Sequence, residues 1–406
     1  MIRTYKFKLY KTKRLKYLHV LINISADIYN HCIALHKRYY RLYHKSINKF
    51  VLQKHITKLK RLSRYNRWNE LGSQAIQDIT ERIDKGYKKF FRHENKRPPT
   101  FKKKRKYKSF TLKGHVGYKL NGNILTVKAR NYKLWLSKEI EGQIKIVTVK
   151  RDSLGDFWLL VSAEVNNVKS ANRATSGKSV GIDFGLKTFL TLGGRHLDFA
   201  DKEREIQSPL YFLKSIGKIR NLSRMLSSKK KGSNNRKEAR IELARLHRKI
   251  ANQRDDFFHK LSNRLASEYE YVFTEDLNLK GMQRLWGRKV SDVSYGRFVK
   301  SLSYKTNIVK IDRFYPSSKT CYDCGYVYRE LSLKERFWVC PVCGKIHHRD
   351  RNAADNIYRV GTSTLAVGIV RPVMPANAVD SRIPCLVGMG SMSKKSNSAI
   401  VVINHN

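Results

Sequence analysis

The chain has 406 residues and is strongly basic: 84 Lys and Arg stand against 32 Asp and Glu, which gives a formal net charge of +52. Such a surplus is costly in self-repulsion unless a polyanion neutralises it, so it predicts nucleic acid as the partner. No 18-residue apolar run and no basic amphipathic membrane helix is present, which argues against a membrane partner. Residues 1–13 lack the apolar core of a signal peptide, so we expect a soluble, cytoplasmic protein of two or three domains.

The first part of the chain predicts one strand followed by helices. Residues 2–10 alternate polar and apolar, and from about 15 to 91 apolar residues recur at helical spacing. Between His36 and His44, lysines and arginines interleave with tyrosines that include Tyr39 and Tyr43. Such a pattern can bind phosphates and stack on bases. By itself, however, it fits a solvated helix with half-buried tyrosines better.

Residues 109–165 predict antiparallel strands. Asn121-Gly122 between two alternating runs indicates a tight hairpin, and residues 144–149 and 157–165 predict a second hairpin that turns near Gly155. Short antiparallel strands of this kind suggest a small barrel, which the first strand could close. Residues 166–178 are polar and rich in Ser and Asn, as in a linker.

The third part predicts a mixed α/β region. Residues 179–183 and 188–192 are expected as paired strands, residues 227–235 as a loop between two long basic helices, and residues 271–274 as a further short strand. Beyond Gly361 the chain turns to small and polar residues, and we expect a flexible tail.

Four cysteines follow the spacing C-x2-C-x15-C-x2-C: Cys321, Cys324, Cys340 and Cys343. Four thiolates in two such pairs can close a tetrahedron around Zn²⁺, and a closed shell of this kind makes a structural site. The alternative, free or disulfide-bonded cysteines, fits this spacing poorly. The remaining two, Cys32 and Cys385, are isolated and read as ordinary core or free thiols.

Three acids of this basic chain stand just past apolar runs or before a helix: Asp183, Glu275 and Asp350. Carboxylates brought together at a sheet edge could bind Mg²⁺, and two such ions could act on a phosphodiester. Each acid also has an ordinary interpretation, as a turn residue, a helix-entry acid and a helix N-cap, respectively. Their shared placement favours a metal site.

These motifs resemble the TnpB family of transposon-encoded, RNA-guided DNA nucleases related to type V CRISPR effectors. The resemblance rests on Gly-Ile-Asp-Phe-Gly at 181–185, Thr-Glu-Asp-Leu at 274–277, Pro-Ser-Ser-Lys at 316–319 before Cys321, and Arg-Asp-x-Asn-Ala-Ala-x-Asn-Ile at 349–357. It implies an α/β multidomain protein with a RuvC-like (RNase H-type) nuclease domain that carries an inserted four-cysteine zinc ribbon. It also implies an N-terminal β-barrel wedge domain interrupted by a helical recognition lobe.

The domain boundaries that follow are 1–10 and 105–170 for the wedge, 11–104 for the helical lobe, 179–320 and 344–360 for the nuclease, 321–343 for the ribbon and 361–406 for the tail. The resemblance assigns Asp183, Glu275 and Asp350 to a Mg²⁺-binding catalytic triad. It implies a guide RNA derived from the transposon end, a double-stranded DNA target and a nucleoid-associated location in a bacterium or archaeon. Polar positions that read a short target-adjacent motif in relatives correspond weakly to Gln74, Gln77 and Thr111.

The chain departs from the family pattern at His348, where relatives often carry an acid, and His347 and His348 could compete for zinc. Two other functions remain open. A guided DNA-binding repressor would lose acids of the triad, whereas all three are present here. A DNA transposase with a similar nuclease core would need no bound RNA.

Overall fold

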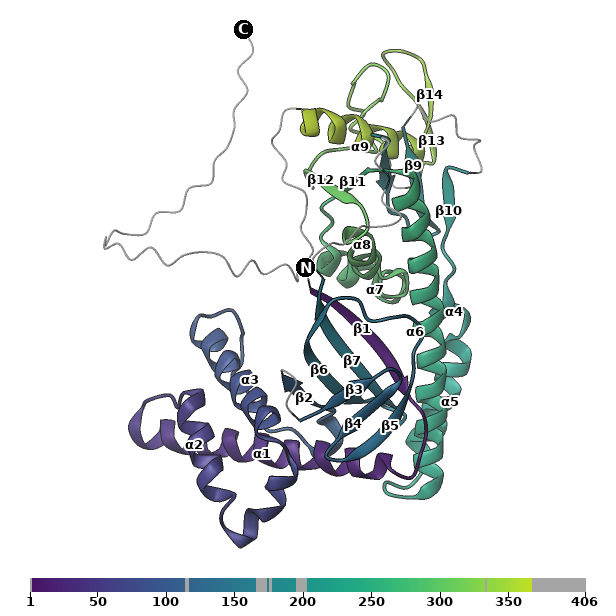
Figure 1. Ribbon diagram of the computed structural model, residues 1–406. Coiled ribbons are helices and arrows are strands. Elements are labelled where there is room, and N and C mark those ends of the chain that lie inside the picture. The colour runs from purple at the N-terminus through teal and green to yellow at the C-terminus, as the bar shows by residue number, and fades with distance from the viewer. Residues whose placement is uncertain are drawn as a thin grey trace, which may run out of the picture.

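The computed structural model describes residues 2–113, 117–165, 174, 177–194, 203–332 and 334–366. Two larger sheets and a small hairpin organise these residues, and one long helix runs along the side of both sheets (Figure 1). Cys385, most of the expected linker at 166–178, and the chain beyond Ala366 lie outside the described residues. No helix of the described residues is long and apolar enough to span a bilayer.

The N-terminal sheet has seven strands: β1 (Ile2–Leu9), β2 (Ser109–Lys113), β3 (Lys119–Asn121), β4 (Ile124–Val127), β5 (Arg130–Trp135), β6 (Gln143–Arg151) and β7 (Phe157–Glu164). Their order is β2-β6-β7-β1-β5-β4-β3, so the first strand of the chain lies in the middle of the sheet. Alternate residues of β7 are buried, as the period of a strand requires. Because β2 and β3 are the two edges of this order, closure into a barrel stays a prediction.

The two hairpins expected from the sequence are present, with one correction. β6 and β7 pair on either side of Gly155, whose φ is +83°. In the β3–β4 hairpin Asn121 pairs with Ile124, so the turn residues are Gly122 and Asn123, one position later than the predicted Asn121-Gly122. Gly122 has a φ of +51°, which glycine adopts without the cost that a side chain would add.

A helical lobe stands between β1 and β2 in the sequence. It comprises α1 (Leu15–Tyr43), α2 (Lys49–Leu59), η1 (Ser63–Glu70) and α3 (Ser73–Phe91), followed by the short η2 (Lys104–Lys106). The buried face of α1 joins its core to that of the sheet. Cys32 is buried on this face, as expected for a core thiol, and burial raises its pKa to about 12.

The second sheet has the order β10-β9-β8-β11-β12, from β8 (Ser179–Asp183), β9 (Thr188–Gly193), β10 (Glu205–Gln207), β11 (Tyr271–Glu275) and β12 (Asn307–Ile311). β8, β11 and β12 run parallel, and β9 and β10 are antiparallel to their neighbours. Central parallel strands are covered on both faces. Accordingly, Val272 of β11 packs into one apolar cluster and its neighbour Phe273 into another.

Helices cover both faces of this sheet. α6 (Asn234–Glu268) and α8 (Tyr295–Ser303) pack on one face, and α9 (Arg349–Ala366) lies across the other. The remaining helices are α4 (Tyr211–Lys214), α5 (Ile216–Ser228) and α7 (Leu279–Val293). Because α9 extends to Ala366, residues 361–366 are helical, which corrects the flexible tail expected from Gly361 onward.

Helix α6 also joins the two sheets (Figure 1). Its Arg248 donates to Asp156, at 2.7 Å, and to Asp152, at 3.1 Å, in the turn between β6 and β7. Asp156 is buried and also pairs with Lys8, at 3.2 Å. Removing one partner from a buried ion pair leaves a charge without compensation, so this cluster holds the N-terminal sheet against α6, which packs on the second sheet.

Candidate nuclease site and cysteine cluster

Asp183 and Glu275 are placed by the register of two parallel strands. Ile182 of β8 pairs with Thr274 of β11, and each acid is the next residue and the last of its strand. The carboxyl ends of parallel strands form the edge of an open α/β sheet where ligands bind. The side chains predicted from the two separate motifs are therefore brought to one edge.

The pKa of Asp183 reflects the negative charges of the other two predicted acids. Burial, and then the negative charges of Glu275 and Asp350, raise the pKa of Asp183 to about 8. Burial also raises the pKa of Glu275, while a hydrogen bond from the Ser317 hydroxyl opposes that rise. Acids that destabilise one another's charge are suited to binding a cation, because the cation relieves the repulsion.

Asp350 reaches this edge in the first turn of α9, and three glycines allow that helix to lie against the sheet. A Cβ on Gly181 of β8 would lie 2.4 Å from the carbonyl oxygen of Ala354, and one on Gly193 of β9 would lie 2.1 Å from the same oxygen. A Cβ on Gly361 of α9 would lie 2.2 Å from Cγ of Phe273 in β11. Any side chain at these positions would push α9, and Asp350 with it, away from the sheet.

The carboxylate of Asp350 is paired with a residue of the cysteine-rich segment. Nη1 of Arg336 lies 3.0 Å from Oδ1 and 2.8 Å from Oδ2 of Asp350. Among the described residues, Asp183, Glu275 and Asp350 do not form a group whose ligand oxygens all lie within 4.8 Å of one another. The three carboxylates converge on one edge but are more widely spread than a closed set of ligands.

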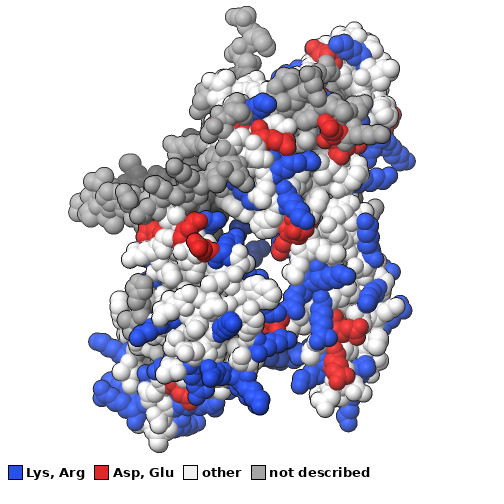
Figure 2. Space-filling model, turned by 45° about the vertical axis from the view of Figure 1, so that its right-hand side comes forward, with Lys and Arg blue, Asp and Glu red and all other residues white. Residues whose placement is uncertain are grey.

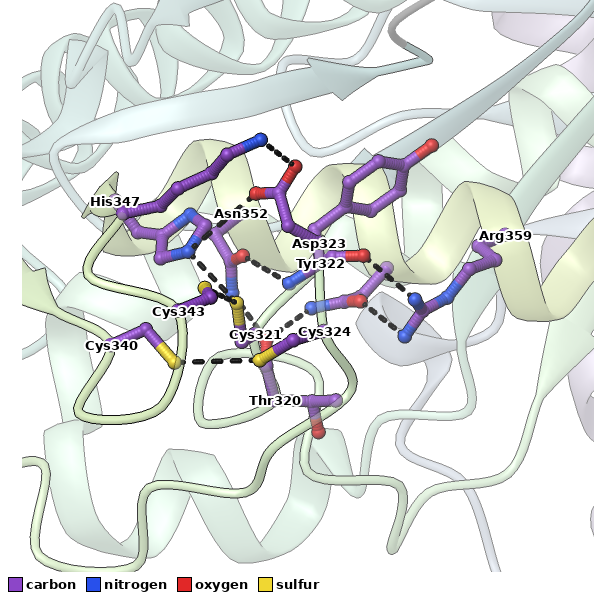
Figure 3. A network of polar contacts seen from close by, with 12 residues as sticks. Thr320, Cys321, Tyr322, Asp323, Cys324, Cys340, Cys343, His347, Asn352 and Arg359 are labelled. Carbon is purple, nitrogen blue, oxygen red and sulfur yellow. Dashed lines mark hydrogen bonds and ion pairs between the residues drawn. The ribbon is translucent and has the colours of Figure 1, made fainter.

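The four predicted cysteines do form a closed set (Figure 3). Their sulfur atoms all lie within 4.8 Å of one another, with Cys321 Sγ 3.6 Å from Cys343 Sγ and Cys324 Sγ 3.5 Å from Cys340 Sγ. A tetrahedron with Zn–S bonds of about 2.3 Å places its sulfur atoms about 3.8 Å apart, so the cluster fits a zinc ion. Gly325 and Gly344, which follow the second cysteine of each pair, have φ values of +77° and +69°.

His347 and Asp323 lie beside the cysteines, and competition of His347 for zinc stays a prediction. Its Nε2 is 3.1 Å from Cys321 Sγ and 3.8 Å from Asp323 Oδ2, and its ring packs on Trp338 across the hairpin of β13 (Phe337–Val339) and β14 (Ile346–His348). Cys321, Asp323 and His347 form a second group whose ligand atoms lie within 4.8 Å of one another. His348 belongs to no such group among the described residues, and its ring packs on Phe337.

Two asparagines of the Arg-Asp-x-Asn-Ala-Ala-x-Asn motif, of which Asn352 is labelled in Figure 3, bind the loop that leads into the cysteine cluster. Asn352 donates to the carbonyl of Thr320, at 2.7 Å, and accepts from the backbone N–H of Tyr322, at 3.0 Å. Asn356 donates to the carbonyls of Thr320, at 2.6 Å, and Ser317, at 2.9 Å. The sequence analysis named these two asparagines only as part of the motif and assigned them no contact. Their spacing of four, which places both on one face of a helix, was the available signal.

The same loop links the cysteines to Glu275. Ser317, whose hydroxyl donates to Glu275, lies four residues before Cys321, and its carbonyl is held by Asn356. Consecutive hydrogen bonds therefore join Glu275 of β11, through Ser317, to Asn356 of α9, the helix that carries Asp350. The same loop continues into Cys321, the first cysteine of the cluster. A metal ion that fixes the cysteines would stabilise the surroundings of both acids.

The residues predicted to contact nucleic acid differ in their surroundings. Tyr39 and Tyr43 lie on α1 with ring centroids 4.7 Å apart, and Tyr43 is exposed. Gln74 of α3 accepts a hydrogen bond from the backbone N–H of Lys113 in β2, at 3.0 Å, and buried Thr111 bonds Thr148 across the sheet. Gln77 is exposed. The motif-reading role of these residues stays a prediction.

Lys and Arg are scattered over the face shown in Figure 2 and lie on both sides of a hollow between its upper and lower parts, where some Asp and Glu are also present. This distribution matches the excess of 84 basic over 32 acidic residues. Basic side chains on both sides of a hollow are suited to a polyanion that runs along it.

Comparison with known proteins identifies the family. Residues 160–285 match a family described as "Probable transposase" (OrfB_IS605), and residues 295–357 match the Cas12f1-like TNB domain. A protein of Streptomyces pristinaespiralis named "Putative RNA-guided DNA endonuclease" is 32% identical over 311 residues, which cover 74% of each chain. "Putative RNA-guided DNA endonuclease InsQ" of Escherichia coli is 27% identical over 322 residues, covering 73% of this chain and 76% of InsQ.

The fold resembles that of a solved protein as well. The chain in the structure titled "Cryo-EM structure of the Cas12f1-sgRNA-target DNA complex" aligns with a TM-score of 0.54 and 15% identity, over 86% of this chain and 83% of that one. At this identity the likeness concerns the fold. The match to the Streptomyces relative covers most of both chains, and relatives named TnpB-like match too, so this chain belongs to the TnpB family.

Proposed function

We propose that this chain is an RNA-guided, divalent-metal-dependent DNA endonuclease that opens and cleaves DNA next to a short target-adjacent motif. The observation that carries the proposal is the convergence of Asp183, Glu275 and Asp350, from three separate segments, on one edge of the second sheet. The names of the relatives and the fold of the Cas12f1 complex support the same function.

The sheet order β10-β9-β8-β11-β12 with α9 across one face supports a RuvC-like, RNase H-type nuclease domain. The N-terminal sheet would be the wedge and α1 to α3 the recognition lobe. Zn²⁺ would be held by the four cysteines as a structural ion. Mg²⁺, when bound by the three carboxylates, would stabilise the charges on the attacking and leaving oxygens of a phosphodiester.

The partners in this proposal are a guide RNA derived from the transposon end and a double-stranded DNA target. Base pairing between RNA and DNA would supply sequence specificity, and the basic surface would hold the backbones of both strands. Such a protein would act in the cytoplasm, in association with the nucleoid. Gln74, Gln77 and Thr111 would read the target-adjacent motif from the junction of α3 and β2.

The experiment compares cutting and binding in one variant. Asp350→Asn removes a charged oxygen ligand and keeps the shape of the side chain, so guided binding of a matched DNA should persist while cutting falls at least about 100-fold. Asp255→Asn, which alters an exposed acid of α6 paired with Arg297, is the matched control and should cut normally. Undiminished cutting by Asp350→Asn with Mg²⁺ would overturn the metal-site assignment.

The description "Probable transposase" attached to one matching family supports a second candidate function, DNA transposition with a similar nuclease core. Sequencing the RNA that copurifies with the protein separates the two. A defined RNA with one constant and one variable part supports the RNA-guided endonuclease. Strand transfer without bound RNA supports the transposase. A repressor would bind guided targets and leave them uncut even with all three acids present.

A further inference from the structure

A cavity of about 340 Å³ opens in the helical lobe, between α1, α3 and the segment 95–107 that leads to the N-terminal sheet. Its volume lies within the range of about 300–1,000 Å³ that is typical of sites for small ligands. Arg151 of β6 donates to the carbonyl of Tyr107, at 3.3 Å, so the cavity lies at the junction of lobe and sheet. No residue assigned to the nuclease edge or to the target motif lines it.

The walls of the cavity are aromatic and proline-rich. Tyr29 of α1 and Tyr107 lie with ring centroids 5.5 Å apart, and Pro98 and Pro99 also line the cavity. The two tyrosines are buried, while the prolines are half-buried. A planar, partly apolar group could pack against such a wall without requiring a particular pattern of donors.

The charges at the cavity are predominantly positive. Arg82, Arg97 and Lys102 line it. Arg82 pairs with Asp78 and donates to the Tyr107 hydroxyl, at 3.2 Å. The ammonium of Lys102, in contrast, lies 4.8 Å from the ring centre of Tyr29 and 5.9 Å from that of Tyr107. Partial desolvation and the nearby charge of Arg82 lower the pKa of Lys102 although the residue is exposed, so an anion in the cavity would be favoured.

The segment that forms one wall is held in place although it has little regular structure. The side chain of Asn30 both donates to and accepts from the backbone of Lys102, at 2.9 and 2.8 Å, and the Tyr29 hydroxyl donates to the carbonyl of Thr100, at 3.1 Å. A Cβ on Gly86 of α3 would lie 2.8 Å from Cγ of Pro99, so the wall packs directly on the helix. The cavity is therefore preformed, which reduces the entropic cost of binding.

We propose that this cavity binds one nucleotide of a nucleic-acid strand, with its phosphate between Arg97 and Lys102 and its base against the proline and tyrosine wall. The proposal deepens the proposed function, on which it rests for the presence of a bound strand. The same nucleotide chemistry could come from RNA or from DNA. The cavity would fix the position of that strand at the junction between the helical lobe and the N-terminal sheet.

The test uses a matched pair of double variants in the full-length protein. Arg97→Gln/Lys102→Met removes two charges at the cavity, and Lys96→Gln/Lys103→Met removes two charges from the adjacent residues, which do not line it. All four side chains are exposed, so both variants should fold, and circular dichroism checks this. Because the change in net charge is the same, the general attraction for a polyanion is matched.

The probes are a single-stranded RNA and a single-stranded DNA of the same ten-nucleotide sequence, each measured by fluorescence anisotropy without divalent metal. We expect the cavity variant to bind at least one probe about tenfold more weakly than the control variant does. A selective loss for RNA, or for DNA, identifies the source of the nucleotide, and loss for both leaves the cavity open to either strand. A loss equal to or smaller than that of the control variant, for both probes, shows a general electrostatic surface and overturns the proposal.

A second measurement places the strand. The same probes carrying 4-thiouridine or 4-thiothymidine should crosslink, on irradiation, to the peptide that contains Tyr107 in the parent protein and less in the cavity variant. Crosslinks confined to other peptides would contradict the site. Neither measurement involves cleavage, so a failure of the cavity and a failure of the proposed nuclease activity are distinguishable.

Discussion

Asp183 and Glu275 end two parallel strands that pair side by side, so both carboxylates leave the second sheet at the same edge. Neither residue is near the other in sequence, and the parallel register of β8 and β11 alone brings them together. Asp350 joins them because α9 lies across the sheet.

The first prediction concerns Gly181. Its substitution by Ala places a methyl group 2.4 Å from the carbonyl oxygen of Ala354 and 2.6 Å from the N–H nitrogen of Tyr358, both in the backbone of α9. Because neither contact can be relieved by moving a side chain, we expect a loss of about 1–3 kcal/mol in the free energy of unfolding. Urea unfolding measures it. Gly217→Ala is the control, because that glycine of α5 has open space around it, and its substitution should be neutral or stabilising by up to about 1 kcal/mol. Equal stability of the two variants would refute the close packing of α9.

The second prediction concerns the cysteine cluster. Cys321→Ser and Cys340→Ser should abolish the binding of about one zinc ion per chain and lower the thermal stability of the segment 317–348, because the binding free energy of a structural zinc is folding free energy. Elemental analysis of the purified protein gives the metal content. Cys32→Ala removes a buried thiol from α1 and should keep the zinc while it destabilises the helical lobe. Zinc-free parent protein that still cuts DNA would contradict this role.

The third prediction concerns Asn356, which is fully buried and donates to the carbonyls of Ser317 and Thr320. Asn356→Ala leaves both acceptors without that donor, at a cost of about 1–3 kcal/mol. Amide hydrogen exchange should become faster in residues 317–322 and also around Glu275, because Ser317 connects the two. Asn234→Ala, at the start of α6, provides a control outside this loop. Exchange that is faster only in the N-terminal sheet would show that the hydrogen-bonded link is unimportant.

The fourth prediction concerns Arg336. Its ion pair with Asp350 occupies a carboxylate that we assign to metal binding, so Arg336→Gln should strengthen the binding of Mn²⁺ to the acids. More than half of the arginine side chain is exposed, and exposed ion pairs contribute about 0–1 kcal/mol, so the expected gain in affinity is at most about fivefold. Isothermal titration calorimetry measures it. Arg329→Gln, in the same cysteine-rich segment, is the matched charge control. Weaker Mn²⁺ binding in Arg336→Gln would indicate that the arginine positions Asp350 and does not compete with the metal.

Features that depend on residues close in sequence were predicted well. The β6–β7 hairpin follows from alternating residues around Gly155, and the β3–β4 hairpin was misplaced by one residue because both Asn121 and Gly122 are common in turns. The end of α9 was placed too early, at Gly361, because the residues beyond it are small and polar. Here the glycine is retained inside the helix, since any Cβ would collide with Phe273.

The sequence by itself determined the cysteine cluster and the three acids. A few consecutive residues are enough to recognise the spacing of metal ligands or a carboxylate next to an apolar run. Tertiary structure alone decided which residues support them: Ser317 on Glu275, Asn356 on the loop before Cys321, and Arg336 on Asp350. It also created the cavity beside Tyr29 and Lys102. These partners come from segments whose contact depends on the packing of a whole helix or sheet. A local pattern of residue types does not predict how a helix packs on a sheet, because the free energy of that packing is spread over every buried contact of the fold.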